Sequence, residues 1–317
     1  MTSGFVVATD PVLPPAGLKR AVYAIGNFDG LHLGHQAVIA RAISLGRERS
    51  APSALLTFEP HPADHFADRP VVFRLTPPEL KVSLCKSFGL SGVVFVTFDA
   101  ALAGLTAEEF VRAVLVERLH VGAVVVGWDF HFGKGRSGTP AFLADAGRRY
   151  GFAVEIVNKV ELGEGEGARI VSSTAIRRAL EHGDVVEAAR GLGRRYAVSG
   201  RVVAGQRLGR TLGVPTANIE LEPTNRLAHG VYAVLAAVDG RTYPAVASFG
   251  VRPTVDNGPP LLEVHLLDFA GDLYNRDMTV EFVGRIREER KFDSLALLVE
   301  EIRRDIARAR AILAIAP

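Results

Sequence analysis

Two histidines spaced three residues apart are the side chains best suited to chemistry in the first half of this 317-residue sequence. His32 and His35 belong to the run GNFDGLHLGH, which follows an apolar segment and opens a helical pattern. A spacing of three puts both imidazoles on one side of a first helical turn. Imidazoles beside a helix N-terminus can stabilise charge that develops on phosphate oxygens. We therefore predict that both histidines are catalytic.

Glycines around this pair permit a tight turn and a close approach of the backbone to a ligand. The residues of the run that we expect to bind nucleotide or phosphate are Gly26, Phe28, Asp29, Gly30 and Gly34. The run lacks the Gly-Lys-Ser/Thr ending of a phosphate loop and the Gly-x-Gly-x-x-Gly spacing of a dinucleotide site. Two alternatives stay open. The histidines could be incidental, or they could bind a metal, for which only His61 and His65 are nearby partners.

Two later segments of the first half also carry polar groups at expected element ends. Asp129, in VVGWDFHFGKGRSGT, follows an apolar strand pattern and can accept hydrogen bonds from a ribose. The hydroxyl residues Ser172, Ser173 and Thr174 precede a helical pattern, where they can cap the helix and bind phosphate. Arg177 adds a guanidinium fork suited to phosphate, so we predict a catalytic role for it. A plain helix cap is the alternative interpretation of this segment.

The second half contains a glycine-rich segment over 200–218 that ends in Pro-Thr-Ala-Asn. Backbone amides of such a loop can hold phosphates, and the expected binding residues there are Gly205, Arg210 and Gly213. Thr216 and Asn218 offer oxygen ligands of the kind that Mg²⁺ accepts. Farther along, Glu263 lies in the strand pattern LLEVHLLDF and could accept a proton from a substrate hydroxyl. By itself it could equally be a solvent-facing glutamate on an alternating strand.

The elements that must position these residues differ between the two halves. In the first half, apolar runs alternate with helical patterns, which predicts a parallel sheet covered on both faces and a ligand site at the carboxyl ends of its strands. The strands are expected at 22–25, 54–58, 93–98, 121–126 and 153–157, and the helices at 37–45, 78–88, 108–119 and 141–150.

In the second half, short apolar runs separated by turn residues predict a small antiparallel barrel or sandwich, with a hairpin at Asp239-Gly240. These runs are expected at 196–203, 230–238, 243–248, 262–269 and 278–283. A long amphipathic helix is expected over 292–313. We expect a mobile turn at 161–167, a short helix and linker at 181–195, and domains at 1–182 and 183–317.

Composition narrows the class of protein. Thirty-seven Lys and Arg against 35 Asp and Glu leave a net charge of +2, which gives no broad attraction for nucleic acid or a membrane surface. We find no signal-peptide pattern and no apolar run of about 18 residues. The single cysteine, Cys85, cannot form an internal disulfide and fits a reducing compartment. We therefore expect a cytoplasmic protein that binds no nucleic acid or membrane and is a monomer or weak homo-oligomer.

The run GNFDGLHLGH resembles the His-x-Gly-His signature of the nucleotidylyltransferase superfamily and, more narrowly, the bacterial bifunctional riboflavin kinase/FMN adenylyltransferase family, also called FAD synthetase. The resemblance extends from about residue 22 to residue 313. The other segments that carry it are VVGWDFHFGKGRSGT, VSSTAIRRAL, GRTLGVPTANI, FGVRPTV and LEVHLLDF. It implies a Rossmann-like nucleotidylyltransferase domain, followed by a small antiparallel β-barrel riboflavin kinase domain with a C-terminal helix.

The resemblance also implies a chemistry for each domain. The second would phosphorylate riboflavin with ATP to FMN, with Thr216 and Asn218 holding Mg²⁺ and ATP phosphates and Glu263 acting as the base. The first would join FMN to AMP from a second ATP, giving FAD and pyrophosphate, with His32, His35 and Arg177 stabilising the leaving group. ATP is thus the co-substrate and Mg²⁺ the cofactor.

The sequence departs from the family pattern at Ser248-Phe249, where many relatives have Asn-Ile, and at Asn275, where many have Gly. Asparagine tolerates a left-handed backbone, so the second change is compatible with the same turn. Two alternatives remain: a nucleotidylyltransferase of another substrate with a degenerate C-terminal kinase module, and a flavin- or nucleotide-binding regulator without turnover.

Overall fold

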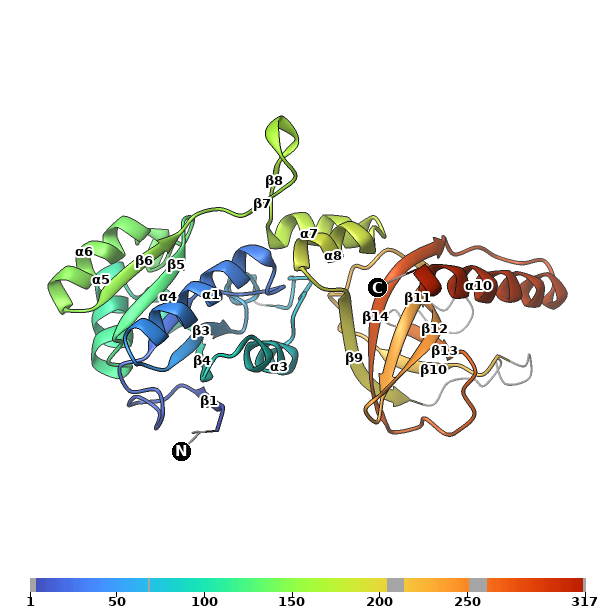
Figure 1. Cartoon of the computed structure of the whole chain (residues 1–317), viewed down its shortest axis with the longest axis horizontal. Helices are drawn as coiled ribbons and strands as arrows, with labels where there is room; N and C mark the ends of the chain where they lie inside the picture. Colours follow the sequence, from blue (N-terminus) through green and yellow to red (C-terminus); the bar gives the residue numbers. More distant parts are fainter. Residues whose placement is uncertain (1–3, 68, 204–213, 251–260, 316–317) are drawn as a thin grey trace. The chain divides into compact units, whose positions relative to one another are not determined.

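The computed structural model describes residues 4–67, 69–203, 214–250 and 261–315 (Figure 1). The contacts within the chain divide it into two compact units, 1–173 and 174–317. Helix α7 (Ser173–Glu181) is therefore grouped almost wholly with the second unit, because Leu180 O accepts a hydrogen bond from Ala228 N and Glu181 pairs with Arg226. The domain ranges 1–182 and 183–317 remain a prediction.

The first unit is built on a six-stranded sheet of order β1-β4-β3-β2-β5-β6, in which every neighbouring pair is parallel. Its strands are β1 (Val6–Thr9), β2 (Val22–Ile25), β3 (Ser53–Glu59), β4 (Gly92–Thr97), β5 (Ala123–Gly127) and β6 (Ala153–Val157). The helices are α1 (Leu33–Glu48), α2 (Pro62–Phe66), α3 (Pro78–Phe88), α4 (Ala100–Gly104), α5 (Ala107–Phe110) and α6 (Pro140–Tyr150). The predicted parallel sheet is confirmed.

Both faces of this sheet are buried, as the continuous apolar strands predict. Tyr23 and Ile25 of β2 pack into one core with residues of the 107–119 helix and of α6. Val22 and Ala24, which alternate with them, pack into a second core with α1 and with Cys85 of α3. The helices cover the two faces of the sheet, so the loops at the carboxyl ends of its strands are where a ligand site is expected.

Two segments of the first unit differ from expectation. The helix predicted over 108–119 changes after α5 into a π-helix (Val111–Arg118), a hydrogen-bonding pattern that residue propensities do not reveal. The segment expected to be a turn at 161–167 is part of a hairpin, in which β7 (Glu161–Leu162) pairs with β8 (Arg169–Ile170). Gly163 and Gly165 adopt positive φ between these strands, and this backbone conformation lets the chain turn back on itself.

The second unit contains a closed antiparallel barrel of order β10-β13-β12-β11-β14-β9. Its strands are β9 (Tyr196–Val203), β10 (Ala217–Glu220), β11 (Gly230–Val238), β12 (Arg241–Gly250), β13 (Leu261–Leu266) and β14 (Asp277–Arg287). The hairpin predicted at Asp239-Gly240 joins β11 to β12, and φ values of 51° and 74° suit a tight turn there. Asn275 has a φ of 61°, so it accepts the left-handed conformation expected of it.

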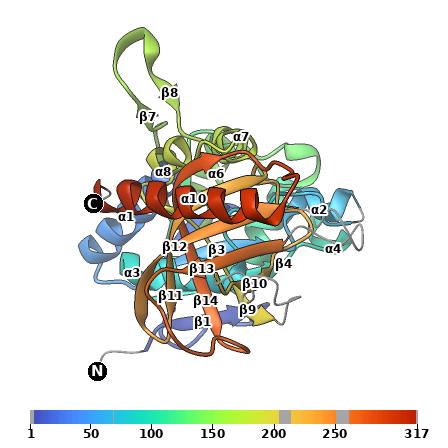
Figure 2. The ribbon, with the colours of Figure 1, turned by 90° about the vertical axis from the view of Figure 1, so that its right-hand side faces the viewer.

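Helices α8 (Val185–Leu192) and α10 (Leu295–Ile315) complete the second unit, and α10 lies across β11, β12 and β14 (Figure 2). The amphipathic helix predicted over 292–313 is confirmed, but its most buried face is partly charged. Glu301 and Asp305 lie one turn apart on that face and are almost fully buried.

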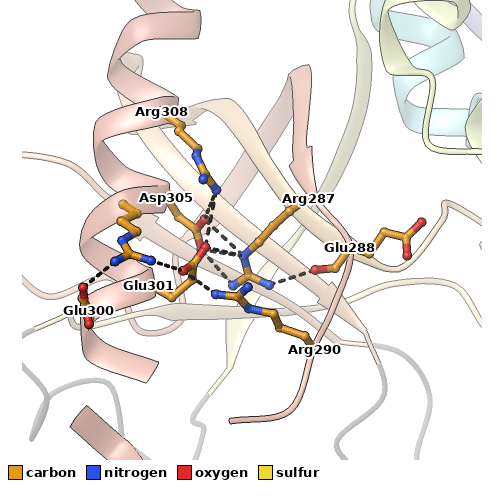
Figure 3. A network of polar contacts seen from close by, with 8 residues as sticks. Arg287, Glu288, Arg290, Glu300, Glu301, Asp305 and Arg308 are labelled. Atoms are coloured by element: carbon orange, nitrogen blue, oxygen red, sulfur yellow. Dashed lines mark hydrogen bonds and ion pairs between the residues drawn. The ribbon is translucent and has the colours of Figure 1, made fainter. Parts of the chain in front are cut away.

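Arginines surround these two carboxylates (Figure 3). Arg287 of β14 donates two hydrogen bonds to Asp305, at 2.8 Å and 3.0 Å to Oδ2, and Arg290 pairs with Glu301. Arg290 and Arg287 also lie over the ring of Phe292, at 4.8 Å and 5.7 Å from its centroid. Buried carboxylates with several arginine partners thus hold the helix to the barrel where an apolar stripe was expected.

Candidate functional site

The predicted histidine pair lies at the start of α1 and its two rings are stacked. Their centroids are 3.6 Å apart and their planes differ by 17°. His32 is the N-cap of α1, and its Nδ1 accepts a hydrogen bond of 3.3 Å from the backbone N–H of His35. A neutral His32 in this arrangement carries its proton on Nε2, which makes that atom a donor. Gly34 leaves room for the His32 ring, because a β-carbon there would come within 3.1 Å of its Cε1.

The loop between β2 and α1 takes an unusual backbone path. Phe28, Gly30 and Leu31 all have positive φ, at 50°, 90° and 44°. Two non-glycine residues in the left-handed region cost conformational energy, so surrounding contacts must hold them there. The ring of Phe28 packs edge-on against His35 at 5.1 Å, and Gly26 lies beside that ring. The loop and the histidine pair therefore form one packed unit.

Asp29 supports the loop from within. Its carboxylate is 2% exposed and accepts hydrogen bonds from the backbone N–H groups of Leu75 and Thr76 at 2.9 Å to 3.1 Å. Thr76 Oγ1 in turn accepts a hydrogen bond from Gly30 N, and Ser173 Oγ donates to the carbonyl of Asp29. These contacts give Asp29 a role in shaping the loop, whereas its predicted phosphate contact stays a prediction.

His35 lies in an environment that disfavours its charged form. Burial, together with repulsion from His32 and Lys81, holds the pKa of His35 well below its usual value of 6.5. Its Nδ1 atom is buried, and the part of the chain that the structure describes offers it no hydrogen-bond partner. His35 is thus neutral at pH 7 and packs against His32 without charge repulsion.

A buried lysine lies below the same loop. The side chain of Lys81, on α3, is 1% exposed, and its Nζ donates to the carbonyl of Asn27 at 3.0 Å, to Thr57 Oγ1 at 3.2 Å and to Glu59 Oε1 at 3.3 Å. Thr57 also donates to the carbonyl of Asn27, at 3.0 Å. Burial lowers the pKa of Lys81, and Glu59 partly offsets this.

The other predicted residues of the first unit follow its strands. Asp129 is exposed two residues after β5, the strand beside β2, so it follows the same edge of the sheet as the loop. Ser172 and Ser173 end the first unit, and Ser173 reaches the loop through Asp29. Thr174 and Arg177 belong to the second unit, so the geometry of the first unit does not include them.

Aromatic rings gather at the carboxyl ends of β3 and β4. His65 and Phe66 of α2 both pack edge-on against Phe98, with centroids 5.5 Å and 5.8 Å away. The Phe66 side chain is 73% exposed, which is unusual for a large apolar ring. His61 accepts a hydrogen bond from Ala63 N and caps α2. Within the described ranges, no group of three or more His, Cys, Asp or Glu side chains is arranged to hold a metal.

The predicted residues of the second unit meet on the outer face of the barrel. Asn218 of β10 pairs directly with Glu263 of β13, and Glu263 pairs with Ser248 of β12 on its other side. Directly paired residues of antiparallel strands have Cβ atoms about 5 Å apart on the same face. Their neighbours Ala217 and Val264, which are buried, point inward. We call Asn218, Glu263 and Ser248 the barrel row.

Thr216 lies immediately before β10, two residues before Asn218. His265, two residues after Glu263, contacts the carbonyl of Pro215 through Nδ1 at 2.8 Å and so ties β13 to this segment. Hydroxyl, amide and carboxylate oxygens are ligands that Mg²⁺ accepts, so the donor set here fits that ion. Gly205, Arg210 and Gly213 lie outside the described residues.

Ser248 and Phe249, which depart from the family pattern, lie on β12 and point to opposite faces. Ser248 is in the barrel row, and Phe249 is fully buried in the barrel. The departure therefore places a shorter polar side chain beside Glu263.

A second carboxylate, Glu289, lies near Glu263. Burial, opposed by His229 and Arg287 and reinforced by repulsion from Glu263, raises the pKa of Glu289.

Sequence reasoning missed Lys81, Thr57, Thr76 and Phe66. One signal could have revealed Lys81: it lies four residues before Cys85, on the same face of α3, and that face is buried. A lysine at such a position requires partners. Thr57 and Thr76 carry no comparable signal, because their roles follow from which loop lies beside them. The exposure of Phe66 is visible only in the fold.

Comparisons with known proteins match both units. The FAD synthetase family model matches residues 15–175, and the riboflavin kinase model matches residues 192–313. The bifunctional riboflavin kinase/FMN adenylyltransferase of Pseudomonas fluorescens is 45% identical over 93% of this chain and 94% of the relative. The protein of the same name from Escherichia coli K12 is 42% identical, with 94% of each chain covered.

A crystal structure of a protein named macrolide-efflux protein, from Streptococcus pneumoniae, shares the fold with a TM-score of 0.82 and 32% identity, over 95% of this chain and 98% of that one. The efflux function in that name is stated for the Streptococcus pneumoniae protein only. In the described part of this chain, no helix is both long and apolar enough to cross a bilayer. The matches to both modules, in one chain and over nearly its whole length, show that it belongs to the bifunctional riboflavin kinase/FMN adenylyltransferase family.

Proposed function

We propose that the barrel row converts riboflavin and ATP to FMN and ADP, and that the histidine loop converts FMN and a second ATP to FAD and pyrophosphate. The observation that carries this proposal is the presence of two separate sets of polar side chains, one at the start of α1 and one across β10, β13 and β12. Each set suits one of the two activities named in the family.

At the histidine loop, an FMN phosphate oxygen would attack the α-phosphorus of ATP, and the bond from that phosphorus to the pyrophosphate oxygen would break. A phosphate is already ionised at neutral pH, so the step needs alignment and charge stabilisation in place of a strong base. His32 would donate from Nε2 to phosphate oxygens, and His35 would hold the His32 ring by stacking. Arg177, Ser172, Ser173 and Thr174 would add phosphate contacts. Asp129 would bind a ribose or the flavin edge.

At the barrel row, Glu263 would accept the proton of the riboflavin 5′-hydroxyl as that oxygen bonds to the γ-phosphorus of ATP. The bond from the γ-phosphorus to the β–γ bridging oxygen would break, and ADP would leave. Thr216 and Asn218 would hold Mg²⁺ together with ATP phosphates, and the ion, when bound, would neutralise negative charge on those phosphates. Asn218 is buried and directly paired with Glu263, which supports a shared site for the metal ligand and the base. Gly205, Arg210 and Gly213 are proposed to contact phosphate.

The exposed ring of Phe66, packed against the half-buried rings of His65 and Phe98, offers a surface on which a flavin ring could stack. It follows β3 and β4, at the same edge of the parallel sheet as the loop after β2. We propose that it receives the isoalloxazine ring during FAD formation.

A nucleotidylyltransferase with a degenerate kinase module is the competing proposal. The direct pairing of Asn218 with Glu263 favours an active kinase module, because it brings a proposed metal ligand beside the proposed base. The further expectations are a cytoplasmic location, no binding to nucleic acid or membrane, and a monomer or weak homo-oligomer. The expectations on location and on nucleic acid and membrane binding rest on the near-neutral charge and the single cysteine.

The test is a time course of the full chain with riboflavin, ATP and Mg²⁺, with the flavins separated by chromatography. The proposal predicts FMN first and FAD later, with one ADP formed for each riboflavin consumed and one pyrophosphate for each FAD. FAD from supplied FMN but no FMN from riboflavin would favour the degenerate module. Flavin that stays unconverted would reject both.

A further inference from the structure

Lys81 is a buried charged group that the mechanism above does not use. An ammonium group taken out of water costs several kcal/mol in free energy unless partners compensate it. The 1% exposure of its side chain, beside the catalytic loop, therefore calls for a function or a complete set of partners.

The partners are complete. An ammonium has three N–H donors, and those of Lys81 have three acceptors: the Asn27 carbonyl, Thr57 Oγ1 and Glu59 Oε1. Glu59 also pairs with Arg74 at 2.5 Å, so its charge is balanced from two sides. Lys81 could contact a substrate phosphate only by giving up one of these bonds. Its geometry therefore argues against direct substrate binding.

What Lys81 holds is a particular peptide group. The Asn27 carbonyl accepts from both Lys81 and Thr57, which occupies its two lone pairs. Because the peptide is planar and trans, fixing this carbonyl points the N–H of Phe28 to the opposite side. Phe28 has a φ of 50°, and its ring packs against His35. The chain of contacts runs from Lys81 through Asn27 and Phe28 to the histidine pair.

We propose that Lys81, together with Thr57, is a positioning residue for adenylyl transfer that fixes the 27–28 peptide and thereby the histidine pair. This inference rests on the proposed FAD formation at the loop. The charged and titratable groups that face Lys81 are Glu59 on β3, Arg74 and Asp29 from loops, His35 on α1 and Cys85 on its own helix. His35 is faced by His32 and Lys81.

The experiment compares Lys81→Met, Thr57→Val and the control Lys86→Met in the full chain. Methionine keeps the length of Lys81 and leaves Glu59 paired with Arg74. Lys86 lies exposed on the same helix, outside the site. We expect Lys81→Met to lower kcat for FAD formation by about 10- to 100-fold, with a smaller change in KM for ATP, because a displaced catalytic group costs rate. Thr57→Val should lower kcat in the same direction, and Lys86→Met should stay within about twofold.

Two readouts separate positioning from general damage. Riboflavin phosphorylation by the same molecules should stay within about twofold of wild type. In Lys81→Met, the pKa of His35, followed by NMR, should rise, because a nearby positive charge that disfavours the imidazolium is gone. A nonspecific loss of packing would hydrate the His35 ring and raise its pKa in Thr57→Val as well, whereas positioning predicts a lower kcat and an unchanged His35 pKa in that variant, because the Lys81 charge remains.

Wild-type-like FAD formation by a folded Lys81→Met variant would overturn the inference, as would an unchanged His35 pKa. If Lys81→Met does not fold, Thr57→Val decides the matter: reduced kcat supports the inference and an unchanged kcat overturns it. Should wild type itself form no FAD, the proposed function fails rather than this inference.

Discussion

The two sites differ in what holds their reacting side chains in place. The histidine loop depends on side-chain contacts with distant segments: Lys81 and Thr57 donate to the carbonyl of Asn27, and Asp29 of the loop accepts from the backbone N–H of Leu75. In the barrel row, Asn218 and Glu263 lie together because their strands pair in that register. In the barrel row, main-chain hydrogen bonds between strands position the reacting side chains, whereas at the loop buried side chains position them.

This difference has a practical consequence. A substitution in the barrel row should remove one chemical group and leave its neighbours in place, because the strand ladder does not depend on that side chain. A substitution of Lys81 or Thr57 should move several groups of the histidine loop at once. Two non-glycine residues of that loop have positive φ, a conformation that depends on surrounding contacts. Changes at the two sites should therefore differ in kind as well as in the reaction they impair.

The largest expected effect comes from Glu263→Gln. Loss of the proposed base should lower kcat for riboflavin phosphorylation by about 10²- to 10⁴-fold, with FAD formation from supplied FMN unchanged. Assays of the two half-reactions on one preparation measure this. Glu281→Gln, a carboxylate on β14 outside the row, is the matched control. Retained phosphorylation in Glu263→Gln would contradict the assignment of the base.

His32→Ala should come next. Removal of one donor to developing phosphate charge should lower FAD formation by about 10²- to 10³-fold while riboflavin phosphorylation continues. His120→Asn offers a control, since His120 is exposed and its φ of 44° is one that asparagine accepts. A variant that loses phosphorylation to the same degree would show that the sites are not independent.

Asp29→Ala should act on stability as well as on rate. The change leaves the buried N–H groups of Leu75 and Thr76 without their acceptor, which should cost the first unit about 2–3 kcal/mol in free energy of unfolding. The only tryptophan, Trp128, lies in this unit, so its fluorescence during urea unfolding measures the change. Asp29→Asn, which retains one acceptor oxygen, should lose less. Equal stability in all three proteins would contradict the supporting role.

The smallest expected effect is a pH dependence of the first unit. The folded pKa of His35 lies below its unfolded value of 6.5, so the unfolded chain binds the extra proton as pH falls through that range. The contribution of His35 should therefore reduce stability by up to about 1.4 kcal/mol per pH unit below 6.5 and vanish above it. Wild type and His35→Gln, compared by Trp128 fluorescence between pH 5 and 8, should diverge only on the acidic side. Parallel curves would contradict a depressed pKa.

The sequence predicted most of the fold, because its signals are local. Apolar strands such as 22–25, the helix 78–88 and the Asp239-Gly240 hairpin each follow from short patterns, and all three are confirmed. The π-helix at 111–118 could not be predicted, because its sequence is equally compatible with an ordinary α-helix. On α10, Glu301 and Asp305 are buried because Arg287 lies opposite them, which depends on packing between elements distant in sequence.

The candidate sites were predictable to different depths. The histidine pair stands in one contiguous run, so its stacking on the first turn of α1 could be anticipated. The supports of that loop come from residues 30 or more positions away, and no local pattern predicts them. Glu263 alone looked like a surface glutamate, and its pairing with Asn218 emerges only from strand register.

The claim that one chain carries two independent sites is tested most directly by mixing two variants. Glu263→Gln and His32→Ala, each alone with riboflavin, ATP and Mg²⁺, should yield little FAD on the time scale of the wild-type reaction, because the first leaves riboflavin largely unconverted and the second accumulates FMN. Mixed together, they should form FAD after a lag, because FMN released by one variant is used by the other. A mixture that forms FMN but no FAD, although each variant still performs its spared half-reaction, would contradict free exchange of FMN between independent sites. Loss of both half-reactions in either folded variant would contradict the two sites themselves.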